Sequence, residues 1–511
     1  MMKRRALLAA AALAGCTKTP LLEGGWVGAS HARGHRLRSS ELPAPAVQRR
    51  ANVLVVGAGI AGLAAARAFA CAGADDVQLL ELEDRFGGNS RGHVLAGQAC
   101  PLGAHYLPLP GPHAHEVSDW LHEIGLLRQE LGRTVAEERH LCHSPQERLF
   151  IDGAWADGLL PPAEPDSSTL VQYRRFADKV AALQRLGFAM PTTRAPWTAN
   201  HATLDAQTFA SWLAREGLND TRLRWYLDYC CRDDYGADSA TVSAWAGLHY
   251  FASRHGFHAA GDDSAEREPV FTWPEGNAWL AARLAAPFAE RIHAGRTVLR
   301  VDEGRHAVQV LAWNEASAQA EQWTAQRVVL ALPLFVAARV LQNPPEALRQ
   351  AAATQTHAPW LVANLHLSQP LLDRPGAPPS WDNVVYGGSG LGYVDAGHQR
   401  LSPLPAPVVL TAYQALPLAQ RGALLNDDWR AWAGRVVDSL AGTHPDLGVK
   451  LLRADLMRYG HAMAVPTPGQ RGSAALAALR AQRGRVRFAH ADLAAYSVFE
   501  EAFTLGTLAA A

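Results

Sequence analysis

Residues 52 to 62 read Asn52-Val-Leu-Val-Val-Gly57-Ala58-Gly59-Ile60-Ala61-Gly62, and residues 77 to 91 read Val77-Gln-Leu-Leu-Glu81-Leu-Glu-Asp-Arg85-Phe-Gly87-Gly88-Asn89-Ser-Arg91. The apolar run before Gly57 is typical of a short strand buried inside a parallel sheet. Gly57 permits a tight turn, Gly59 lets the backbone approach a pyrophosphate, and Gly62 lets the next helix pack close to the strand. Glu81 ends the second strand, where a carboxylate accepts the ribose hydroxyls. The two segments predict a βαβ unit in which residues 57–62 and Glu81 bind a dinucleotide.

A second glycine turn, Arg85-Phe-Gly87-Gly88, follows the acid. It resembles the Arg-x-Gly-Gly segment with which flavoproteins of the glutathione-reductase type wrap the FAD pyrophosphate. The resemblance implies FAD as the cofactor, and it places Arg85, Gly87, Gly88 and Asn89 beside the pyrophosphate. Asn89 stands where these proteins usually carry a second arginine. A nicotinamide cofactor is the alternative that the glycine pattern alone leaves open.

The C-terminal residues 485–511 resemble the closing segment of the flavin amine oxidase superfamily, which includes polyamine and monoamine oxidases, protoporphyrinogen oxidase and carotenoid desaturases. In that family an acid after the last strand reaches the ribityl or pyrophosphate part of FAD, and a final helix points its N-terminus at the isoalloxazine. The resemblance assigns the acid to Asp492, in a loop one residue longer than usual. It assigns the start of the helix to Val498 and Phe499.

The start of this final helix also has a local signature. Ser497-Val-Phe-Glu500 predicts a capping box, in which Ser497 and Glu500 satisfy amides at the helix start. A helix N-terminus carries about half a positive charge. Aimed at the flavin, it would stabilise the anionic reduced ring. An ordinary capped helix that packs on the core is the alternative.

The resemblance extends along the chain and implies its domain organisation. Gly103-Ala104-His105-Tyr106 matches an element whose backbone lies along the flavin, and Val298 matches a strand residue whose backbone binds the adenine. The implied fold is α/β: a glutathione-reductase-like, doubly wound FAD-binding domain formed by residues 51–108, 268–340 and 456–511. A mixed α+β substrate domain, residues 109–267 and 341–455, is inserted between these segments. The length of 511 residues also favours two domains.

Composition and the first residues bear on partners and location. Lysine plus arginine and aspartate plus glutamate number 48 each, and the absence of a basic stripe argues against nucleic acid. Lys3-Arg4-Arg5, an apolar run and Leu13-Ala14-Gly15-Cys16 predict an export signal over residues 1–16 with a lipoprotein box. Cleavage elsewhere is the alternative, and Arg4-Arg5 is also consistent with twin-arginine export. Residues 17–50 are predicted to be a tether. We therefore expect a bacterial envelope protein on the periplasmic side, anchored to the membrane surface through a lipid on Cys16. No complete set of metal ligands is apparent, so no metal is predicted.

The residues that carry the chemistry are less clear. In amine oxidases the carbon beside the substrate nitrogen gives a hydride to flavin N5, and two aromatic rings clamp the amine. The resemblance suggests Tyr459 as one catalytic wall, with Phe499 or Tyr496 as the other; packing of Tyr459 in the core is the alternative. No lysine lies between residues 180 and 449, so the lysine that many amine oxidases place near N5 is absent. Asn364 or His366 would be the polar groups nearby. No cysteine follows residue 231, so the C-terminal cysteinyl–flavin bond of monoamine oxidases cannot form, and the resemblance implies non-covalent FAD.

One polar cluster, Trp225-Tyr-Leu-Asp228-Tyr-Cys-Cys-Arg232-Asp233-Asp234-Tyr235, falls in the expected substrate domain. Its carboxylates could bind the distal ammonium groups of a polyamine, or they could form only a local ion-paired loop. We expect an FAD-dependent oxidoreductase that acts on the C–N bond of an amine or polyamine. The alternatives are dehydrogenation of C–C bonds, as in desaturases and protoporphyrinogen oxidase, and a flavin-binding lipoprotein without turnover.

Overall fold

The computed structural model describes residues 22–39, 41–254, 256–259, 269–402 and 406–511. The expected signal, residues 1–16, lies outside them. Among the described residues no helix is long and apolar enough to cross a membrane.

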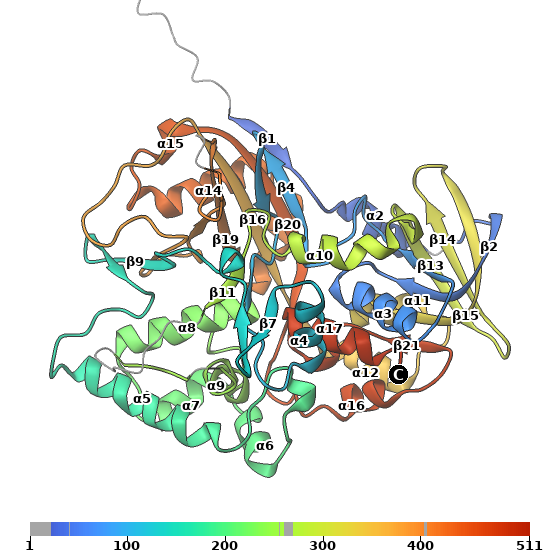
Figure 1. Ribbon diagram of the computed structural model, residues 1–511, viewed down its shortest axis with the longest axis horizontal. Coiled ribbons are helices and arrows are strands. Elements are labelled where there is room, and N and C mark those ends of the chain that lie inside the picture. The colour runs from blue at the N-terminus through green and yellow to red at the C-terminus, as the bar shows by residue number, and fades with distance from the viewer. Residues whose placement is uncertain (1–21, 40, 255, 260–268, 403–405) are drawn as a thin grey trace, which may run out of the picture.

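The first sheet contains the glycine fingerprint (Figure 1). Its strand order is β12-β3-β2-β15-β14-β13, with β21 beside β15. Strands β12, β3, β2, β15 and β21 run parallel to their neighbours, whereas β13, β14 and β15 form an antiparallel meander. The bounds are β2 Pro45–Val56, β3 Val77–Leu80, β12 Ile292–His293, β13 Arg296–Glu303, β14 Val308–Asn314, β15 Gln319–Leu330 and β21 Val486–Phe488. Helix α3 (Ile60–Cys71) packs on β2 and β3, and α17 (Phe499–Leu508) packs on α3.

The second sheet belongs to the substrate domain and has the order β1-β20-β16-β19-β18-β17-β9-β10. The bounds are β1 Glu23–Trp26, β9 Glu147–Ile151, β10 Ala154–Asp157, β16 Thr356–Leu367, β17 Asp382–Val385, β18 Tyr393–Asp395, β19 Val408–Ala415 and β20 Leu451–Val465. Helix α14 (Trp429–Ala441) contacts β1 and β20 and contributes to an apolar cluster with this sheet. A group of five helices lies below the sheet in Figure 1: α5 Ser168–Gln184, α6 Ala199–Asp205, α7 Phe209–Arg215, α8 Thr221–Tyr235 and α9 Ala244–Ala252.

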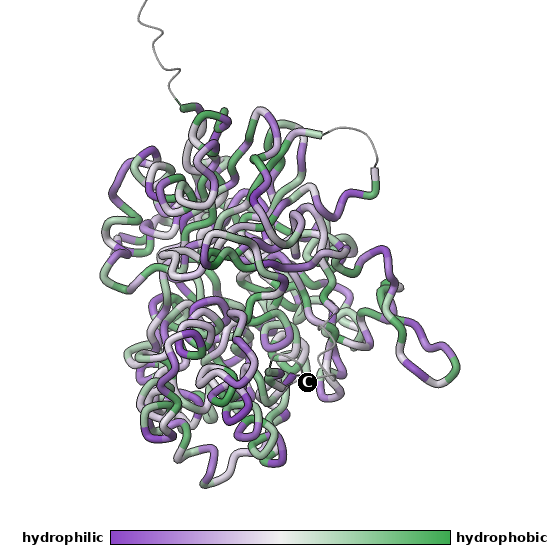
Figure 2. The backbone as a smooth tube through the Cα atoms, turned by 90° about the vertical axis from the view of Figure 1, so that its left-hand side faces the viewer, coloured by the Kyte–Doolittle hydropathy of each residue, from purple (hydrophilic) through white to green (hydrophobic). Residues whose placement is uncertain are grey.

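The remaining elements are short. They are α2 His31–His35, β4 Gly92–Leu95, β5 Gln98–Pro101, β6 Tyr106–Pro108, α4 His115–Glu123, β7 Leu127–Glu130, β8 Arg133–Ala136, β11 Val270–Thr272, α10 Ala278–Ala285, α11 Leu334–Val340, α12 Glu346–Thr354, α13 Arg421–Asn426, α15 Leu447–Lys450 and α16 Ala474–Ala481. Figure 2 shows hydrophilic stretches concentrated in the loops that project from the molecule.

Two of the expected boundaries are wrong. The predicted tether, residues 17–50, is folded from residue 22 onward: β1 pairs with β20 with Glu23 opposite Arg453, and β2 begins at Pro45. Backbone pairing with a strand more than 400 residues away cannot be read from a polar composition. Residues 456–465, expected in the FAD-binding domain, are the second half of β20 and pair with β16 in the substrate sheet.

Candidate active site

The glycine loop between β2 and α3 has the geometry that its sequence predicts. Gly57 has a φ of +100°, and a Cβ there would lie 2.4 Å from the Ala331 carbonyl oxygen. A Cβ on Gly62 would lie 1.9 Å from the Gly57 carbonyl oxygen, so only glycine lets α3 start this close to the strand. A Cβ on Gly59 would meet Gly88 at 3.7 Å, which brings the two glycine turns together. Ala58, Ile60 and Ala61 lie buried between these glycines.

Glu81 lies next to this loop. Its Oε2 accepts a hydrogen bond from the Ala58 amide at 2.8 Å, and its Oε1 accepts one from the Glu83 amide at 2.9 Å. Burial raises the pKa of the Glu81 carboxyl, which these amides and Arg91 oppose. The acid is therefore fixed beside the first glycine turn, as expected for a ribose-binding residue.

The second glycine turn packs directly on the first. The Gly87 amide donates to the Ala58 carbonyl at 2.8 Å, and Gly87 and Gly88 both have positive φ angles, +116° and +56°. Asn89 donates from its side chain to the Ala462 carbonyl at 2.6 Å. Arg85, which the sequence suggested as a pyrophosphate ligand, is exposed.

Arg91 is a residue that the sequence reasoning missed. Its side chain is 6% exposed, and one guanidinium nitrogen, Nη2, donates to Asp84 at 2.6 Å. The other, Nη1, is buried without a hydrogen-bond partner. A buried guanidinium with one nitrogen left free beside two glycine turns is suited to an anionic diphosphate, so the residues present fit FAD. An arginine three residues after a Gly-Gly pair was the available signal.

The expected adenine and flavin segments adjoin this cradle. The Arg296 amide donates to the Glu81 carbonyl at 2.8 Å, so β13, which carries Val298 two residues further on, starts beside the acid that is expected to bind the ribose. The Ala104 amide donates to the Asn89 carbonyl at 2.8 Å, so the segment from Gly103 to Tyr106 continues from the second glycine turn.

The predicted capping box at the start of the C-terminal helix is not formed. Helix α17 begins at Phe499, and neither Ser497 nor Glu500 caps it. The capping box is therefore wrong, because the Ser497 hydroxyl accepts the Ala464 amide of β20 instead, at 2.9 Å. The first amides of α17, after Val498, have no side-chain cap.

Asp492 is fully buried, and its Oδ2 lies 2.9 Å from the Leu334 amide and 3.0 Å from His357 Nε2. Burial alone would raise the pKa of this carboxyl, but charge interaction with His490 and the contact with His357 outweigh it and lower the pKa well below its usual range. Asp492 is thus anionic and holds the start of α11. Its contact with FAD stays a prediction.

The suggested catalytic residues do not come together as expected. The Tyr459 hydroxyl donates to the Leu102 carbonyl at 2.9 Å. Phe499 instead packs at 6.1 Å from Trp120 and 5.9 Å from Phe503 in the core of the FAD-binding domain. Tyr496 donates to Asp234 at 2.5 Å. Among the described residues no ring contact joins Tyr459 to Phe499 or Tyr496.

The side chain of Asn364 also forms structural hydrogen bonds. Its Nδ2 donates to the Pro101 carbonyl at 3.0 Å, and its Oδ1 accepts from Thr411 at 2.7 Å. The side chain is completely buried. Asn364 therefore holds the strand that leads into Leu102 and Gly103, and a catalytic role for it is not supported.

An aromatic wall that the sequence did not identify lies beside Gly103 to Tyr106. Tyr413 donates to the Gly103 carbonyl at 3.0 Å, and its ring stacks on His105 at 4.4 Å. Trp381 lies 5.5 Å from His105 and 6.1 Å from Tyr106. Burial lowers the pKa of His105 to about 4, so this ring is neutral at pH 7.

Two carboxylates adjoin this wall. The Tyr106 hydroxyl donates to Asp233 Oδ2 at 3.4 Å. Burial, and then Asp234, raise the pKa of Asp233 to about 7. Burial, Glu147 and Asp233 raise the pKa of Asp382 well above its usual range. We call His105, Tyr106, Asp233, Trp381, Asp382 and Tyr413 the acidic–aromatic cluster.

The polar stretch 225–235 lies in helix α8 rather than in a loop, and its acids have separate partners. Asp228 accepts from Ser239 at 2.9 Å and lies 3.6 Å from Arg232, as the local alternative proposed. Asp234 pairs with Arg254 at 3.2 Å. Of these three acids, Asp233 is the one that accepts a hydrogen bond from Tyr106, in the segment expected to lie along the flavin.

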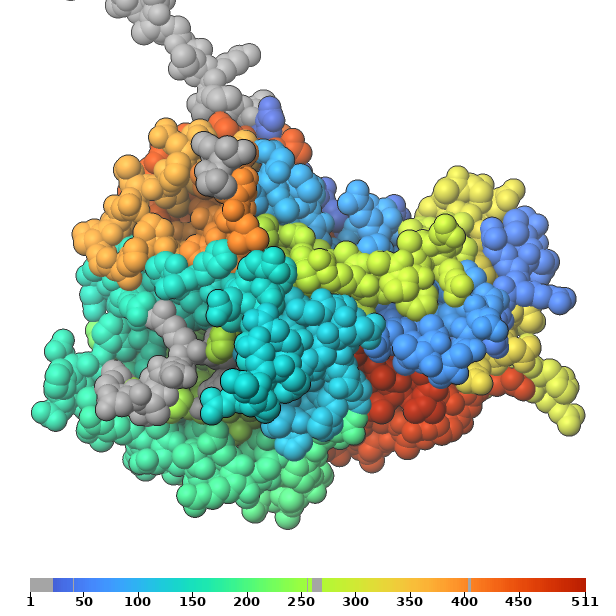
Figure 3. All heavy atoms as spheres, in the orientation of Figure 1, coloured from blue at the N-terminus to red at the C-terminus, as the bar shows by residue number. Residues whose placement is uncertain are grey.

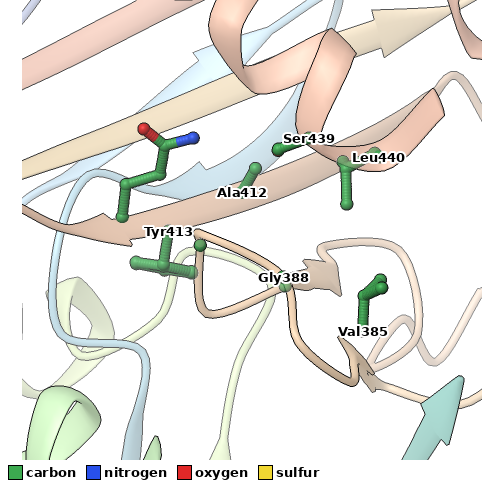
Figure 4. A pocket seen from close by; sticks show the side chains of 9 residues that line it. Val385, Gly388, Ala412, Tyr413, Ser439 and Leu440 are labelled. Atoms are coloured by element: carbon green, nitrogen blue, oxygen red, sulfur yellow. The ribbon is translucent and has the colours of Figure 1, made fainter. Parts of the chain in front are cut away.

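A small pocket lies apart from this chemistry, lined by Gly388, Ala412, Ser439, Leu440 and their neighbours (Figure 4). It shares only Tyr413 with the cluster and has no charged side chain in its lining, so we assign it no function. Among the described residues no group of three histidine, cysteine or acidic side chains is placed to hold a metal ion.

Two packed glycine turns, the buried carboxylate of Glu81 beside them and a C-terminal helix without a side-chain cap agree with the comparison with known proteins. The model of the family described as flavin containing amine oxidoreductase matches residues 60–511. The chain belongs to this family. It is an FAD-dependent oxidoreductase with the FAD-binding α/β fold and a substrate domain.

The individual relatives below share less than 30% sequence identity with this chain. The "Putative flavin-containing monoamine oxidase AofH" of Mycobacterium tuberculosis is 27% identical over 300 residues, which span 58% of this chain and 59% of that protein. A structure of putrescine oxidase bound to putrescine has a TM-score of 0.68 at 18% identity and covers 91% of this chain and 98% of its own. Cyclohexylamine oxidase from Brevibacterium oxydans has a TM-score of 0.64 at 17% identity and covers 90% and 98%.

Proposed function

We propose that this enzyme oxidises the C–N bond of an amine that carries a second cationic nitrogen, as diamines and polyamines do. The acidic–aromatic cluster carries the proposal. Burial, Glu147 and then Asp233 raise the pKa of Asp382. Burial and Asp234 raise the pKa of Asp233, and Arg254 and Arg232 oppose this rise. Among the described residues, however, these two arginines form their salt bridges with Asp234 and Asp228, and neither Asp233 nor Asp382 has a salt bridge of its own. A bound ammonium group would supply the missing positive charge.

The aromatic members suit the same ligand. Aromatic rings attract a cation by roughly 0.5–2 kcal/mol and exclude water from its neighbourhood. Tyr413, Trp381 and Tyr106 surround His105, which is neutral and therefore does not repel an ammonium group. The relative solved with putrescine in its site is consistent with such a substrate.

Bound FAD would supply the hydride acceptor for the carbon next to the substrate nitrogen. Glu81, Arg91 and the two glycine turns would hold its nucleotide part. Asp233 and Asp382 bind the distal ammonium, and the rings of the cluster orient the carbon chain. No cysteine follows residue 231, so we expect the cofactor to be held non-covalently.

Three variants test the substrate class. Asp233→Asn and Asp382→Asn each remove one carboxyl group from the cluster, and Asp228→Asn, on the same helix as Asp233, is the control. Loss of a hydrogen bond to a charged group costs about 1.5–3 kcal/mol, so the two cluster variants should weaken diamine binding roughly 10- to 100-fold. Binding of a monoamine of equal length, such as n-butylamine against putrescine, should change little. An equal loss for both amines would contradict the assignment.

The reaction itself is tested by anaerobic mixing of the purified flavoprotein with a panel of compounds. Bleaching of the flavin by diamines supports amine oxidation. Bleaching only by a lipophilic polyene or a porphyrinogen would identify dehydrogenation at C–C bonds, which the absence of lysine between residues 180 and 449 keeps as the alternative. No bleaching by any compound would indicate a flavin-binding protein without turnover.

A further inference from the structure

The chain enters the fold very close to the lipoprotein box. Six residues, 17–22, separate Cys16 from β1, which begins at Glu23. Seven residue steps span at most about 25 Å even when fully extended. Because residues 23–26 are bound into the substrate sheet and are not a tether, a lipid on Cys16 would keep this end of the sheet next to the bilayer.

Exposed apolar side chains gather at this same end. Val449 is 86% exposed, Leu372 is 62% exposed and Leu452 is 48% exposed. Val449 lies on α15 and Leu452 at the start of β20, whose next residue, Arg453, is opposite Glu23 of β1. Figures 1 and 3 show α15 and β1 at the upper end of the molecule. We call Leu372, Val449 and Leu452 the apolar rim.

The backbone that carries the rim is firmly held. The Leu372 amide donates to Asp446 at 2.8 Å, and the Ser368 amide donates to the Lys450 carbonyl at 2.9 Å. The Lys450 ammonium lies 2.7 Å from both Asp446 and the Pro370 carbonyl. The rim is therefore presented to solvent by a fixed loop and helix.

Two basic side chains beside the rim have acidic partners, while Asp373 and Glu23 are exposed nearby. Lys450 pairs with Asp446, and Arg453 pairs with Asp455 at 2.9 Å. Exposed apolar side chains whose neighbouring cations are paired are suited to the boundary between headgroups and acyl chains.

We propose that the apolar rim rests in the interfacial layer of the membrane to which the lipid on Cys16 anchors the protein. The lipid supplies the attachment, and the rim fixes the orientation of the substrate sheet at the surface. This proposal rests on lipidation of Cys16 and is independent of the reaction.

The test uses the full chain, expressed with its signal and reconstituted into vesicles of phosphatidylethanolamine and phosphatidylglycerol. An environment-sensitive fluorophore is attached at Val449→Cys, in a background where Cys71 and Cys142 are changed to serine. Val171→Cys is the matched control, because Val171 is 57% exposed on α5, at the opposite end of the molecule in Figure 1. Flavin absorbance reports that each labelled protein is folded.

The expected result is a blue shift at position 449, with quenching by nitroxide-labelled lipid, and neither effect at position 171. Equal behaviour at both positions on bound vesicles would overturn the docking of the rim. A concentration-dependent shift at position 449 without vesicles would instead identify a second copy of the chain as the occupant. Mass spectrometry that finds Cys16 unmodified, with no co-sedimentation, would overturn the lipid anchor on which the proposal rests.

Discussion

Replacing Gly62 by alanine tests the glycine cradle most sharply. Its Cβ would lie 1.9 Å from the Gly57 carbonyl oxygen, whereas ordinary contact begins at 3.4 Å. The first glycine turn would have to retreat by about 1.5 Å, the difference between these distances. Overpacking of this kind costs about 1–3 kcal/mol, more than the roughly 1 kcal/mol that alanine gains over glycine in a helix. We expect Gly62→Ala to be less stable than the wild type and to lose FAD.

Gly434→Ala is the matched control. Gly434 also lies inside a helix, α14, but nothing lies within 4 Å of the Cβ that alanine would add. Its free energy of unfolding should rise by about 0.5–1 kcal/mol through helix propensity alone. Urea denaturation and the ratio of absorbance at 450 nm to that at 280 nm measure both properties. If Gly62→Ala matches Gly434→Ala in stability and flavin content, the reasoning about the cradle is refuted.

Three further predictions concern charged side chains. Arg91→Met should raise the dissociation constant for FAD roughly 10- to 100-fold, because it removes the buried guanidinium nitrogen that has no partner in the protein. If Arg85→Met has an equal or larger effect in the same titration, Arg91 is not the main pyrophosphate ligand. Burial raises the pKa of Glu500 from 4.5 to about 7, so the folded state loses up to about 3 kcal/mol of stability as the pH rises from 4.5 to 7. Glu500→Gln should abolish this loss, as measured by urea denaturation at pH 5 and pH 8. Because Asp233 has a pKa of about 7 and binds a cation only when ionised, kcat/KM for a diamine should fall as pH drops below 7 in the wild type; Asp233→Asn should remove this fall, and its persistence would exclude Asp233 as the titrating group.

The geometry of the first glycine turn was predictable because it is set locally. The positive φ of Gly57, the close contact of Gly62 and the position of Glu81 all depend on residues within one βαβ unit. A sequence pattern can specify such a unit completely.

Where the structure differs from the sequence predictions, the residue in question has a hydrogen-bond partner that is distant in sequence. Ser497 and Glu500 have the spacing of a capping box, but the amide of Ala464, on a neighbouring strand, takes the serine hydroxyl. Asn364 is a polar residue in an apolar strand, and nothing in its surroundings along the chain reveals that Pro101 is its partner.

Neighbouring acids on α8 show the same limit. Asp233 and Asp234 point about 100° apart around the helix, so one reaches Tyr106 and the other reaches Arg254. The sequence places them together and cannot say which one faces the flavin side. That choice depends on how α8 packs against the substrate sheet.

The most direct test of the proposed reaction is the anaerobic reduction of the enzyme-bound flavin by putrescine, followed at 450 nm beside n-butylamine at equal concentrations. The account predicts bleaching by putrescine at concentrations at least tenfold lower than those required for n-butylamine, because only the diamine places a second ammonium group against Asp233 and Asp382. A flavin that stays oxidised with both amines, or that n-butylamine bleaches as readily as putrescine, would contradict it.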